Sequence, residues 1–128
     1  MSYKILIVDD EEPVRELFGD LLRKEKCSVH SLSTAEEAID CINGEDFDAV
    51  LMDIKLAGMS GLEALKRMKE LKPQLPVIMI TGFGYDELLI AKSKEYGCCG
   101  YIGKNMPISQ IISNFKLFMK TAKERSSL

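Results

Sequence analysis

The stretch FDAVLMDIKLAGMSGLEALKRM, residues 47–68, decides the fold. It joins an apolar run to a carboxylate, Asp53, then to a loop that holds Gly58 and Gly61, and then to an amphipathic segment from Leu62. A strand that ends in a carboxylate, followed by a glycine-containing turn and a helix, is how an open α/β sheet presents a reactive group at its edge. Asp is also a common turn residue, so this stretch alone fits a simple strand terminator equally well.

Composition restricts the classes of protein to consider. The chain has 128 residues, of which 46% are hydrophobic and 29% charged, and this fits one domain with a real core. The net charge of −3 argues against direct nucleic-acid binding, which needs a basic face. The first apolar run, residues 5–8, is too short for a signal peptide or a membrane span. We therefore expect a cytoplasmic protein that does not bind membranes.

The cysteines and the single histidine predict neither a metal site nor a redox motif. None of the four cysteines forms a C-x-x-C pair, and we expect all of them to be buried and reduced. His30 lies in the short run from Cys27 to Leu32, away from any helix and from any cluster of cysteines or carboxylates, which predicts a structural role. The cysteines are Cys27, Cys41, Cys98 and Cys99.

Five apolar runs of strand length alternate with five amphipathic segments. Such alternation predicts an α/β fold with a parallel sheet and helices on both faces, because each parallel crossover needs a covering helix. We expect a single domain over residues 1–122, and a frayed tail or the start of a linker over 123–128. The expected strands are residues 5–8, 28–32, 47–52, 77–80 and 99–103, and the expected helices begin near Pro13, Thr34, Ser60, Asp86 and Ile108 and end after Leu22, at Asn43-Gly44, at Lys72, at Tyr96 before Gly97, and at Lys120.

The helical spacing of apolar residues predicts which side chains face the core. Two capping boxes, Thr34 to Glu37 and Ser60 to Glu63, mark helix starts. The inward residues are Val14, Leu17, Phe18, Leu21 and Leu22; Ala35, Ala38, Ile39 and Ile42; Leu62, Leu65 and Met68; and Ile108, Ile111, Ile112, Phe115 and Met119.

Reactive side chains follow four of the five strands. Asp9 and Asp10 end the first strand, Asp53 the third, Thr81 the fourth and Lys104 the fifth. Because the carboxyl ends of parallel strands meet at one edge, these residues should gather there. Three clustered carboxylates need a cation, and Mg²⁺ prefers such oxygen ligands. A carboxylate beside Mg²⁺, with a lysine and a threonine aimed at developing phosphoryl charge, indicates a phosphoryl acceptor.

The ordered set of motifs resembles the receiver domain of bacterial two-component response regulators over nearly the whole chain. The resemblance implies a flavodoxin-like (βα)5 fold with strand order 2-1-3-4-5. The matching motifs are ILIVDDE at residues 5–11, LMDIKL at 51–56, GMSG at 58–61, ITG at 80–82 and YIGK at 101–104.

The resemblance also implies the chemistry of the site. Asp53 would accept a phosphoryl group from the phosphohistidine of a histidine kinase or phosphotransfer protein. Asp10, Asp53 and the backbone carbonyl of Lys55 would ligate Mg²⁺, or Mn²⁺ as an alternative ion, and Asp9 would act through a metal-bound water. Lys104 would bind the phosphoryl oxygens.

The same resemblance implies a switch rather than an enzyme. Thr81 would bind a phosphoryl oxygen, and Tyr101 would be the switch aromatic that turns inward as Thr81 moves. Leu117 and Phe118, off the core stripe of the last helix, are candidates for contact with an output domain or a second copy of the chain. Such a protein is a signalling phosphoacceptor that assists its own phosphotransfer and dephosphorylation.

The sequence departs from the family pattern in the loops. Ala57 stands where proline is usual, and Asn105 and Met106 separate Lys104 from Pro107, whereas the family usually has proline directly after the lysine, often with a cis bond. The cation of Lys55 and the ring of Phe83, each two positions after a site residue, predict a long-lived phosphoryl group.

Three alternatives stay open. A degenerate receiver would act as a phosphorylation-independent interaction module. A phosphohydrolase of haloacid-dehalogenase type needs a second aspartate where Lys55 stands. A flavodoxin-like FMN protein needs a phosphate-binding loop where the chain has the acidic run at residues 9–12.

Overall fold

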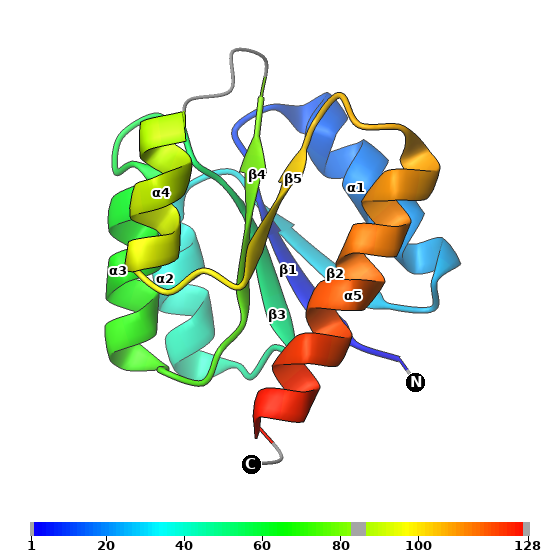
Figure 1. The fold of residues 1–128 in the computed structure, drawn as a ribbon. Coiled ribbons are helices and arrows are strands. Elements are labelled where there is room, and N and C mark those ends of the chain that lie inside the picture. The colour runs from blue at the N-terminus through cyan, green and yellow to red at the C-terminus, as the bar shows by residue number, and fades with distance from the viewer. Residues whose placement is uncertain (1, 83–86, 127–128) are drawn as a thin grey trace.

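The computed structural model describes residues 2–82 and 87–126, and these form alternating strands and helices around one parallel sheet (Figure 1). The strand order is β2-β1-β3-β4-β5, which confirms the predicted flavodoxin-like topology. The elements are β1 Lys4–Val8, α1 Glu12–Lys24, β2 Ser28–Leu32, α2 Ala35–Gly44, β3 Ala49–Asp53, α3 Gly61–Leu71, β4 Val77–Thr81, α4 Glu87–Glu95, β5 Gly100–Gly103 and α5 Ile108–Ser126.

The register of the strands aligns their carboxyl ends. Val8 of β1 pairs with Met52 of β3, and Asp53 pairs with Ile80 of β4. Thr81 then pairs with Gly103 of β5. The residue at or just after the end of each of these strands therefore lies at one edge of the sheet, as the sequence predicts.

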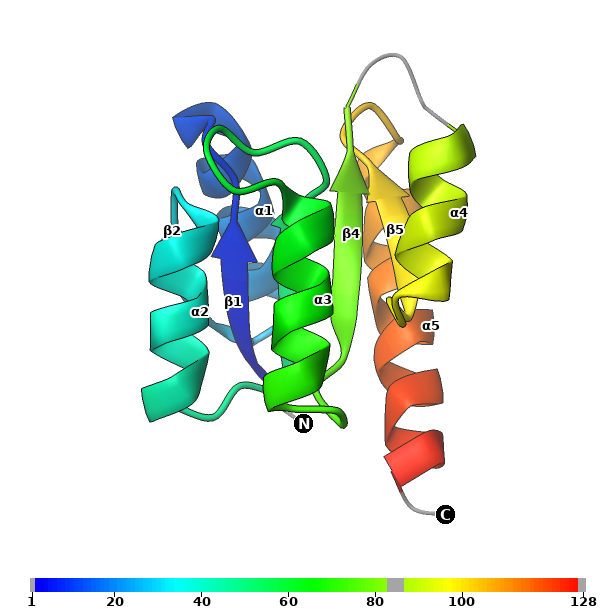
Figure 2. The ribbon, with the colours of Figure 1, turned by 90° about the vertical axis from the view of Figure 1, so that its left-hand side faces the viewer.

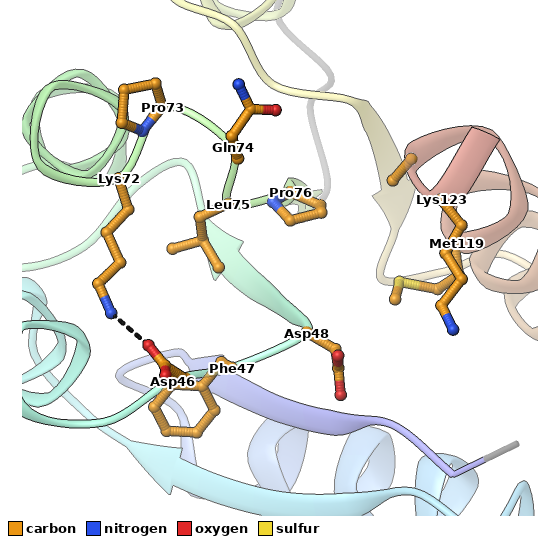
Figure 3. A pocket seen from close by; sticks show the side chains of 11 residues that line it. Asp46, Phe47, Asp48, Lys72, Pro73, Gln74, Leu75, Pro76, Met119 and Lys123 are labelled. Carbon is orange, nitrogen blue, oxygen red and sulfur yellow. Dashed lines mark hydrogen bonds and ion pairs between the residues drawn. The ribbon is translucent and has the colours of Figure 1, made fainter. Parts of the chain in front are cut away.

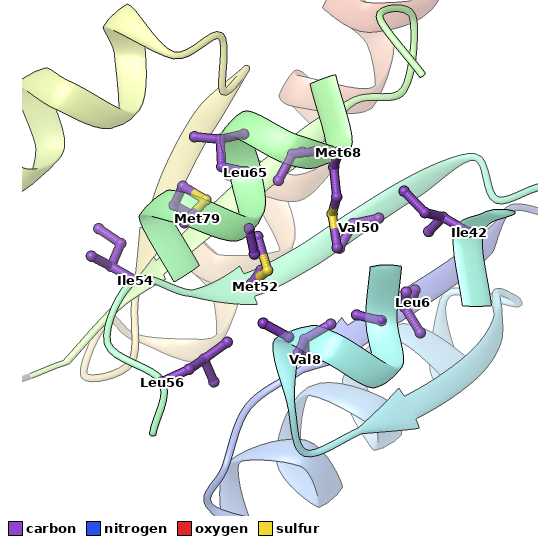
Figure 4. Packing of buried hydrophobic residues seen from close by; sticks show 14 of the residues in the cluster. Leu6, Val8, Ile42, Val50, Met52, Ile54, Leu56, Leu65, Met68 and Met79 are labelled. Carbon is purple, nitrogen blue, oxygen red and sulfur yellow. The ribbon is translucent and has the colours of Figure 1, made fainter. Parts of the chain in front are cut away.

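Helices cover both faces of the sheet (Figure 2), and an apolar layer of side chains lies between the helices and the sheet on each face. Helices α2, α3 and α4 cover one face, where Leu65 and Met68 of α3 pack on Val50 and Met52 of β3 (Figure 4). Helices α1 and α5 cover the other face. All of β3 is buried, which explains why its sequence is a continuous apolar run rather than an alternating one.

The helix starts follow the predicted capping residues. The hydroxyl of Thr34 accepts a hydrogen bond from the Glu37 amide at 3.2 Å, and that of Ser60 accepts one from the Glu63 amide at 3.2 Å. Of the ends of α2 and α5, one differs from expectation. The end of α5 does so, because this helix continues past Lys120 to Ser126. The end of α2 agrees with the prediction, since Gly44 is its last residue. The assignment of 123–128 as a tail or linker start stays a prediction.

Some predicted core positions are wrong. Leu17 is 39% exposed because it lies at the margin of the buried face of α1. Ile108 is 56% exposed because it is the first residue of α5, before that helix meets the sheet. Leu62 is half-buried. Phe118, predicted to lie off the core stripe, is half-buried over β5, where a Cβ on Gly100 would lie 2.4 Å from its ring.

Within the described residues the four cysteines form no disulfide, as predicted, but only Cys27 is buried. Cys41, Cys98 and Cys99 are half-buried, because they lie at the rims of the apolar layers rather than within them. Within the described residues, no helix is both long and apolar enough to cross a membrane.

Candidate functional site

The carboxyl edge of the sheet brings together Asp9, Asp53, Thr81 and Lys104. Asp9 is fully buried, and Asp53 and Thr81 are 5% and 8% exposed. The ammonium of Lys104 lies 3.0 Å from Asp53 Oδ2 and 3.1 Å from Asp9 Oδ2. Asp9 and Lys104 are 95 positions apart in the sequence, and both belong to this one group of charged side chains. The strand ends therefore gather at one edge, as predicted.

Sequence reasoning missed one member of this cluster, Glu11. Its carboxylate lies 2.8 Å from Lys104 Nζ, so a single ammonium contacts three carboxylates. One carboxylate oxygen from each of Asp9, Asp10, Glu11 and Asp53 falls within 4.8 Å of the others. The acidic run at residues 9–12 was the signal in the sequence that could have identified Glu11. It was missed because the resemblance assigned roles only to Asp9 and Asp10.

Backbone amides hold the two buried aspartates in place. Asp53 Oδ1 accepts a hydrogen bond from the Lys55 amide at 3.1 Å, and Asp9 Oδ1 accepts one from the Glu11 amide at 2.9 Å. Both are local turns in which an aspartate bonds the amide two residues later. Arg15, which the sequence did not single out, donates to the Asp9 carbonyl at 2.6 Å and so fixes the start of the acidic loop.

Lys104 reaches the site although no proline follows it. Its amide donates to the Thr81 carbonyl at 2.7 Å, and the Met106 amide donates to the Gly103 carbonyl at 3.2 Å. No cis peptide bond occurs among residues 2–82 and 87–126. Pairing with β4 and the turn over 103–106 therefore position the lysine.

Gly61 permits the close approach of α3 to the site. A Cβ at this position would lie 1.8 Å from the carbonyl oxygen of Asp53, a backbone atom that cannot rotate away. The Gly61 amide instead donates to the Ile54 carbonyl at 3.0 Å. Gly58, earlier in the same loop, has φ +76°, a conformation that favours glycine.

The two predicted switch residues occupy different surroundings. Thr81 is buried at the end of β4, whereas Tyr101 of β5 is half-buried against the layer of α2, α3 and α4. The ammonium of Lys94 lies 5.8 Å from the centre of the Tyr101 ring. Phe83, the second residue predicted to tune dephosphorylation, lies outside the described residues.

Burial and charge set the protonation of the site. Burial raises the pKa of Asp53, and the neighbouring Asp9 carboxylate adds to the rise, although Lys104 and the Lys55 amide oppose it. Burial disfavours the charged form of Lys104, but its pairing with the Glu11, Asp53 and Asp9 carboxylates outweighs burial and raises the pKa of this lysine. The bond from Lys104 lowers the pKa of Glu11. The lysine is therefore a permanent cation.

The donor set suits a hard divalent cation. All four clustered acidic residues offer carboxylate oxygens, the ligands that Mg²⁺ prefers. Asp9 Oδ2 is fully buried and makes no hydrogen bond within the described residues, despite its ion pair with Lys104. Because buried charged oxygens are normally satisfied, this oxygen favours an additional cation at the site.

A pocket at the opposite end of the sheet offers no comparable chemistry (Figure 3). It is lined by Phe47, Leu75 and Pro76 together with an ion pair between Lys72 and Asp46 at 2.9 Å. This pair links the loop after α3 to the loop after α2, which is a structural role.

A parallel sheet of this order with an acidic pocket and a lysine at its carboxyl edge defines a receiver-type signalling domain. The sequence matches the model of the response regulator receiver domain family over residues 5–116. The chain belongs to this family, whose members are signalling domains.

Individual relatives agree with this assignment. Sporulation initiation phosphotransferase F of Bacillus subtilis is 35% identical over 119 residues, which cover 93% of this chain and 95% of that protein. Regulatory protein VanR of Enterococcus faecium is 34% identical over all of this chain, which spans 54% of VanR. Some relatives thus match the chain nearly end to end, and for others the chain spans about half their length.

Solved structures give the same result. The receiver domain of NtrX from Brucella abortus superposes with a TM-score of 0.85 and 30% identity, covering 91% of this chain and 98% of that one. A longer NtrX structure matches 99% of this chain with a TM-score of 0.93 and 29% identity, but the match covers 29% of its own length.

Proposed function

We propose that this chain is the phosphoacceptor of a two-component phosphorelay, with Asp53 as the residue that is phosphorylated. The single observation that carries the proposal is the contact of Lys104 with Asp53 at 3.0 Å inside a cluster of four carboxylates. The donor would be the phosphohistidine of a histidine kinase or of a phosphotransfer protein. The product would be an aspartyl phosphate in the cytoplasm.

The residues of the site divide the work of transfer. A carboxylate oxygen of Asp53 attacks phosphorus and forms an O–P bond, while the P–N bond to the donor imidazole breaks and its electron pair returns to the ring nitrogen. Lys104 starts on the carboxylates and is placed to pair with an anionic phosphoryl oxygen as it arrives. Thr81, at the end of β4, would donate its hydroxyl to another such oxygen.

Asp10, Asp53 and the backbone carbonyl of Lys55 would hold the divalent cation, with Asp9 acting through water. When bound, Mg²⁺ supplies positive charge that lowers the repulsion between the carboxylates and the incoming phosphoryl group. Asp9 and Glu11 already hold Lys104 in the pocket before transfer. Their role would be to position the lysine between the carboxylates and the phosphoryl group.

The switch would follow from the added charge. A phosphoryl group brings about −1 to −2 charges to the loop edge. Thr81 would move toward it, and Tyr101 would turn inward and change the surface formed by α4, β5 and α5, where an output domain or a second copy could bind. Leu117, 58% exposed on α5, lies on this surface.

The donor specificity is testable with a small P–N donor. Phosphoramidate with Mg²⁺ should add one phosphoryl group to the chain, as measured by intact mass, and phosphorylated histidine kinase should do so faster. Asp53→Asn should abolish the adduct, and Asp46→Asn, at the far end of the sheet, should retain it. A folded protein that takes no phosphoryl group from either donor would contradict the proposal and favour a phosphorylation-independent interaction module.

A further inference from the structure

His30, Cys41 and Glu45 converge on the outer edge of the sheet, far from the acidic pocket. One ligand atom from each lies within 4.8 Å of the others. The sequence predicted a structural role for His30 because no cluster of cysteines or carboxylates lies near it in the chain. In the structure this reason does not hold, because α2 returns over β2 and brings Cys41 and Glu45 close to His30. From this juxtaposition we propose that His30, Cys41 and Glu45 bind a borderline-soft divalent cation of the zinc class.

The topology explains why these residues meet. β2 is an edge strand, and His30 pairs in register with Leu6, which faces the layer of α2 and α3. His30 therefore lies on the α2 side of the sheet. Cys41 lies in the last turn of α2, and Glu45 is the extended residue that directly follows this helix; the hydrogen bond between their side chains places both on one side of the helix end.

A hydrogen bond within the triad places a displaceable proton between two of its three groups. The thiol of Cys41 donates a hydrogen bond to Glu45 Oε1 at 4.0 Å. Lys4 holds the other oxygen, Oε2, in an ion pair, and its ammonium lies 5.0 Å over the ring of Phe47. Oε1 is thus turned toward the cysteine, and a metal would replace the thiol proton between them.

His30 is placed to complete the set. Its ring packs edge-on against Phe47 with centroids 6.2 Å apart, and among residues 2–82 and 87–126 neither ring nitrogen makes a hydrogen bond or ion pair. The side chain is exposed, so it can rotate toward the sulfur. Donor atoms on one tetrahedral zinc ion lie about 3.5 Å apart, and the three groups must therefore close by roughly 1 Å.

The donor chemistry distinguishes this site from the acidic pocket. A nitrogen, a sulfur and an oxygen suit Zn²⁺, whereas four carboxylates suit Mg²⁺. Three protein ligands leave a fourth position for water. The site would join the edge strand β2 to the end of α2.

The test uses Zn²⁺ and Co²⁺ on the whole chain with Mg²⁺ in excess and a thiol-free reductant. We expect one tight Zn²⁺ per chain by calorimetry, and a thiolate-to-cobalt charge-transfer band with Co²⁺. Cys41→Ser should abolish the band. His30→Gln and Glu45→Gln should each weaken Zn²⁺ binding by more than about tenfold, since even loss of a supporting residue costs that much at metal sites.

Matched controls separate this site from other metal binding. Cys98→Ser, at another half-buried cysteine, and Asp53→Asn, in the acidic pocket, should keep both the band and the affinity. The absence of a band, or unchanged Zn²⁺ affinity in His30→Gln, would overturn the proposal. His30 is exposed, so that variant stays decisive if Cys41→Ser folds poorly. The zinc and cobalt results do not depend on whether Asp53 can be phosphorylated, so failure of the proposed function would leave this test intact.

Discussion

The two ends of the sheet each hold a lysine–aspartate ion pair, and the two pairs have nearly the same length but differ in burial. At the carboxyl end, Lys104 and Asp53 are 3.0 Å apart, with side chains 16% and 7% exposed. At the amino end, Lys72 and Asp46 are 2.9 Å apart, with side chains 32% and 101% exposed. The length of the ion pair therefore does not distinguish the two ends of the sheet, but the burial of its side chains does.

The number of charges in contact also differs. Lys104 contacts three carboxylates, two of them buried, whereas Lys72 pairs with one exposed carboxylate. The pKa of Asp53 is raised by burial, while the hydrogen bond from Lys72 lowers the pKa of Asp46. The acidic cluster at the carboxyl end therefore holds more carboxylates than the one ammonium in contact with them can neutralise, whereas Lys72 and Asp46 form a neutral pair.

Replacing the lysine at each end should give the largest difference between the two ends of the sheet. Lys104→Met removes the ammonium that contacts Asp53, and we expect the rate of Asp53 phosphorylation by acetyl phosphate to fall by about 100-fold or more, as on loss of a charge-stabilising donor. Lys72→Met should leave that rate unchanged. Equal rates in both variants, measured by intact mass against time, would remove the distinction between the two ends.

Alanine at two glycines tests the packing around the same two ends. Gly61→Ala forces a Cβ against the Asp53 carbonyl, and we expect a loss of about 2–3 kcal/mol in the free energy of unfolding. A Cβ on Gly44 meets no atom within 4 Å, so Gly44→Ala should gain up to about 1 kcal/mol. Urea unfolding measures both, and a harmless Gly61→Ala would show that the loop over Asp53 is not tightly packed.

The pKa values of Asp53 and Asp46 are shifted in opposite directions, and the pH dependence of each end of the sheet should show this difference. Because the pKa of Asp53 is raised, this nucleophile protonates earlier as pH falls, and phosphorylation should be lost at a higher pH than an ordinary aspartate gives. Because the pKa of Asp46 is lowered, its stabilising ion pair persists until pH falls through that lower value. Carboxyl carbon NMR titration of the metal-free protein should place Asp53 above Asp46. The reverse order would contradict the burial argument.

The smallest effect is expected at the rim of the carboxyl end. Glu11 contacts Lys104 but is exposed, so Glu11→Gln should change the phosphorylation rate by less than about fivefold. Asp9→Asn, at the buried contact, should reduce the rate much further. Should Glu11→Gln match Asp9→Asn in the same kinetic assay, the rim carboxylate would belong to the reactive core.

The sequence was most informative where local signals and the sheet agree. Apolar runs and capping residues placed the strands and helix starts, and reactive side chains at strand ends predicted the gathering of Asp9, Asp53, Thr81 and Lys104. These features follow from chain periodicity and from the geometry of parallel sheets.

Other features depend on contacts that a sequence does not contain. Glu11 joins the site because Lys104 extends to it, and His30 meets Cys41 because α2 returns over an edge strand. The exposure of Leu17 and Ile108 depends on where each helix leaves the sheet. The role of Gly61 requires the position of the Asp53 carbonyl, although the two glycines in the loop were visible.

The most direct measurement maps the phosphoryl group among the clustered carboxylates. The chain is incubated with acetyl phosphate, with and without Mg²⁺, reduced with borohydride to convert an acyl phosphate to an alcohol, and sequenced by mass spectrometry. Modification at Asp53 alone, only with Mg²⁺, is the result we predict. Modification at Asp9, Asp10 or Glu11, or equal modification without Mg²⁺, would contradict the assignment of Asp53 as the phosphoacceptor.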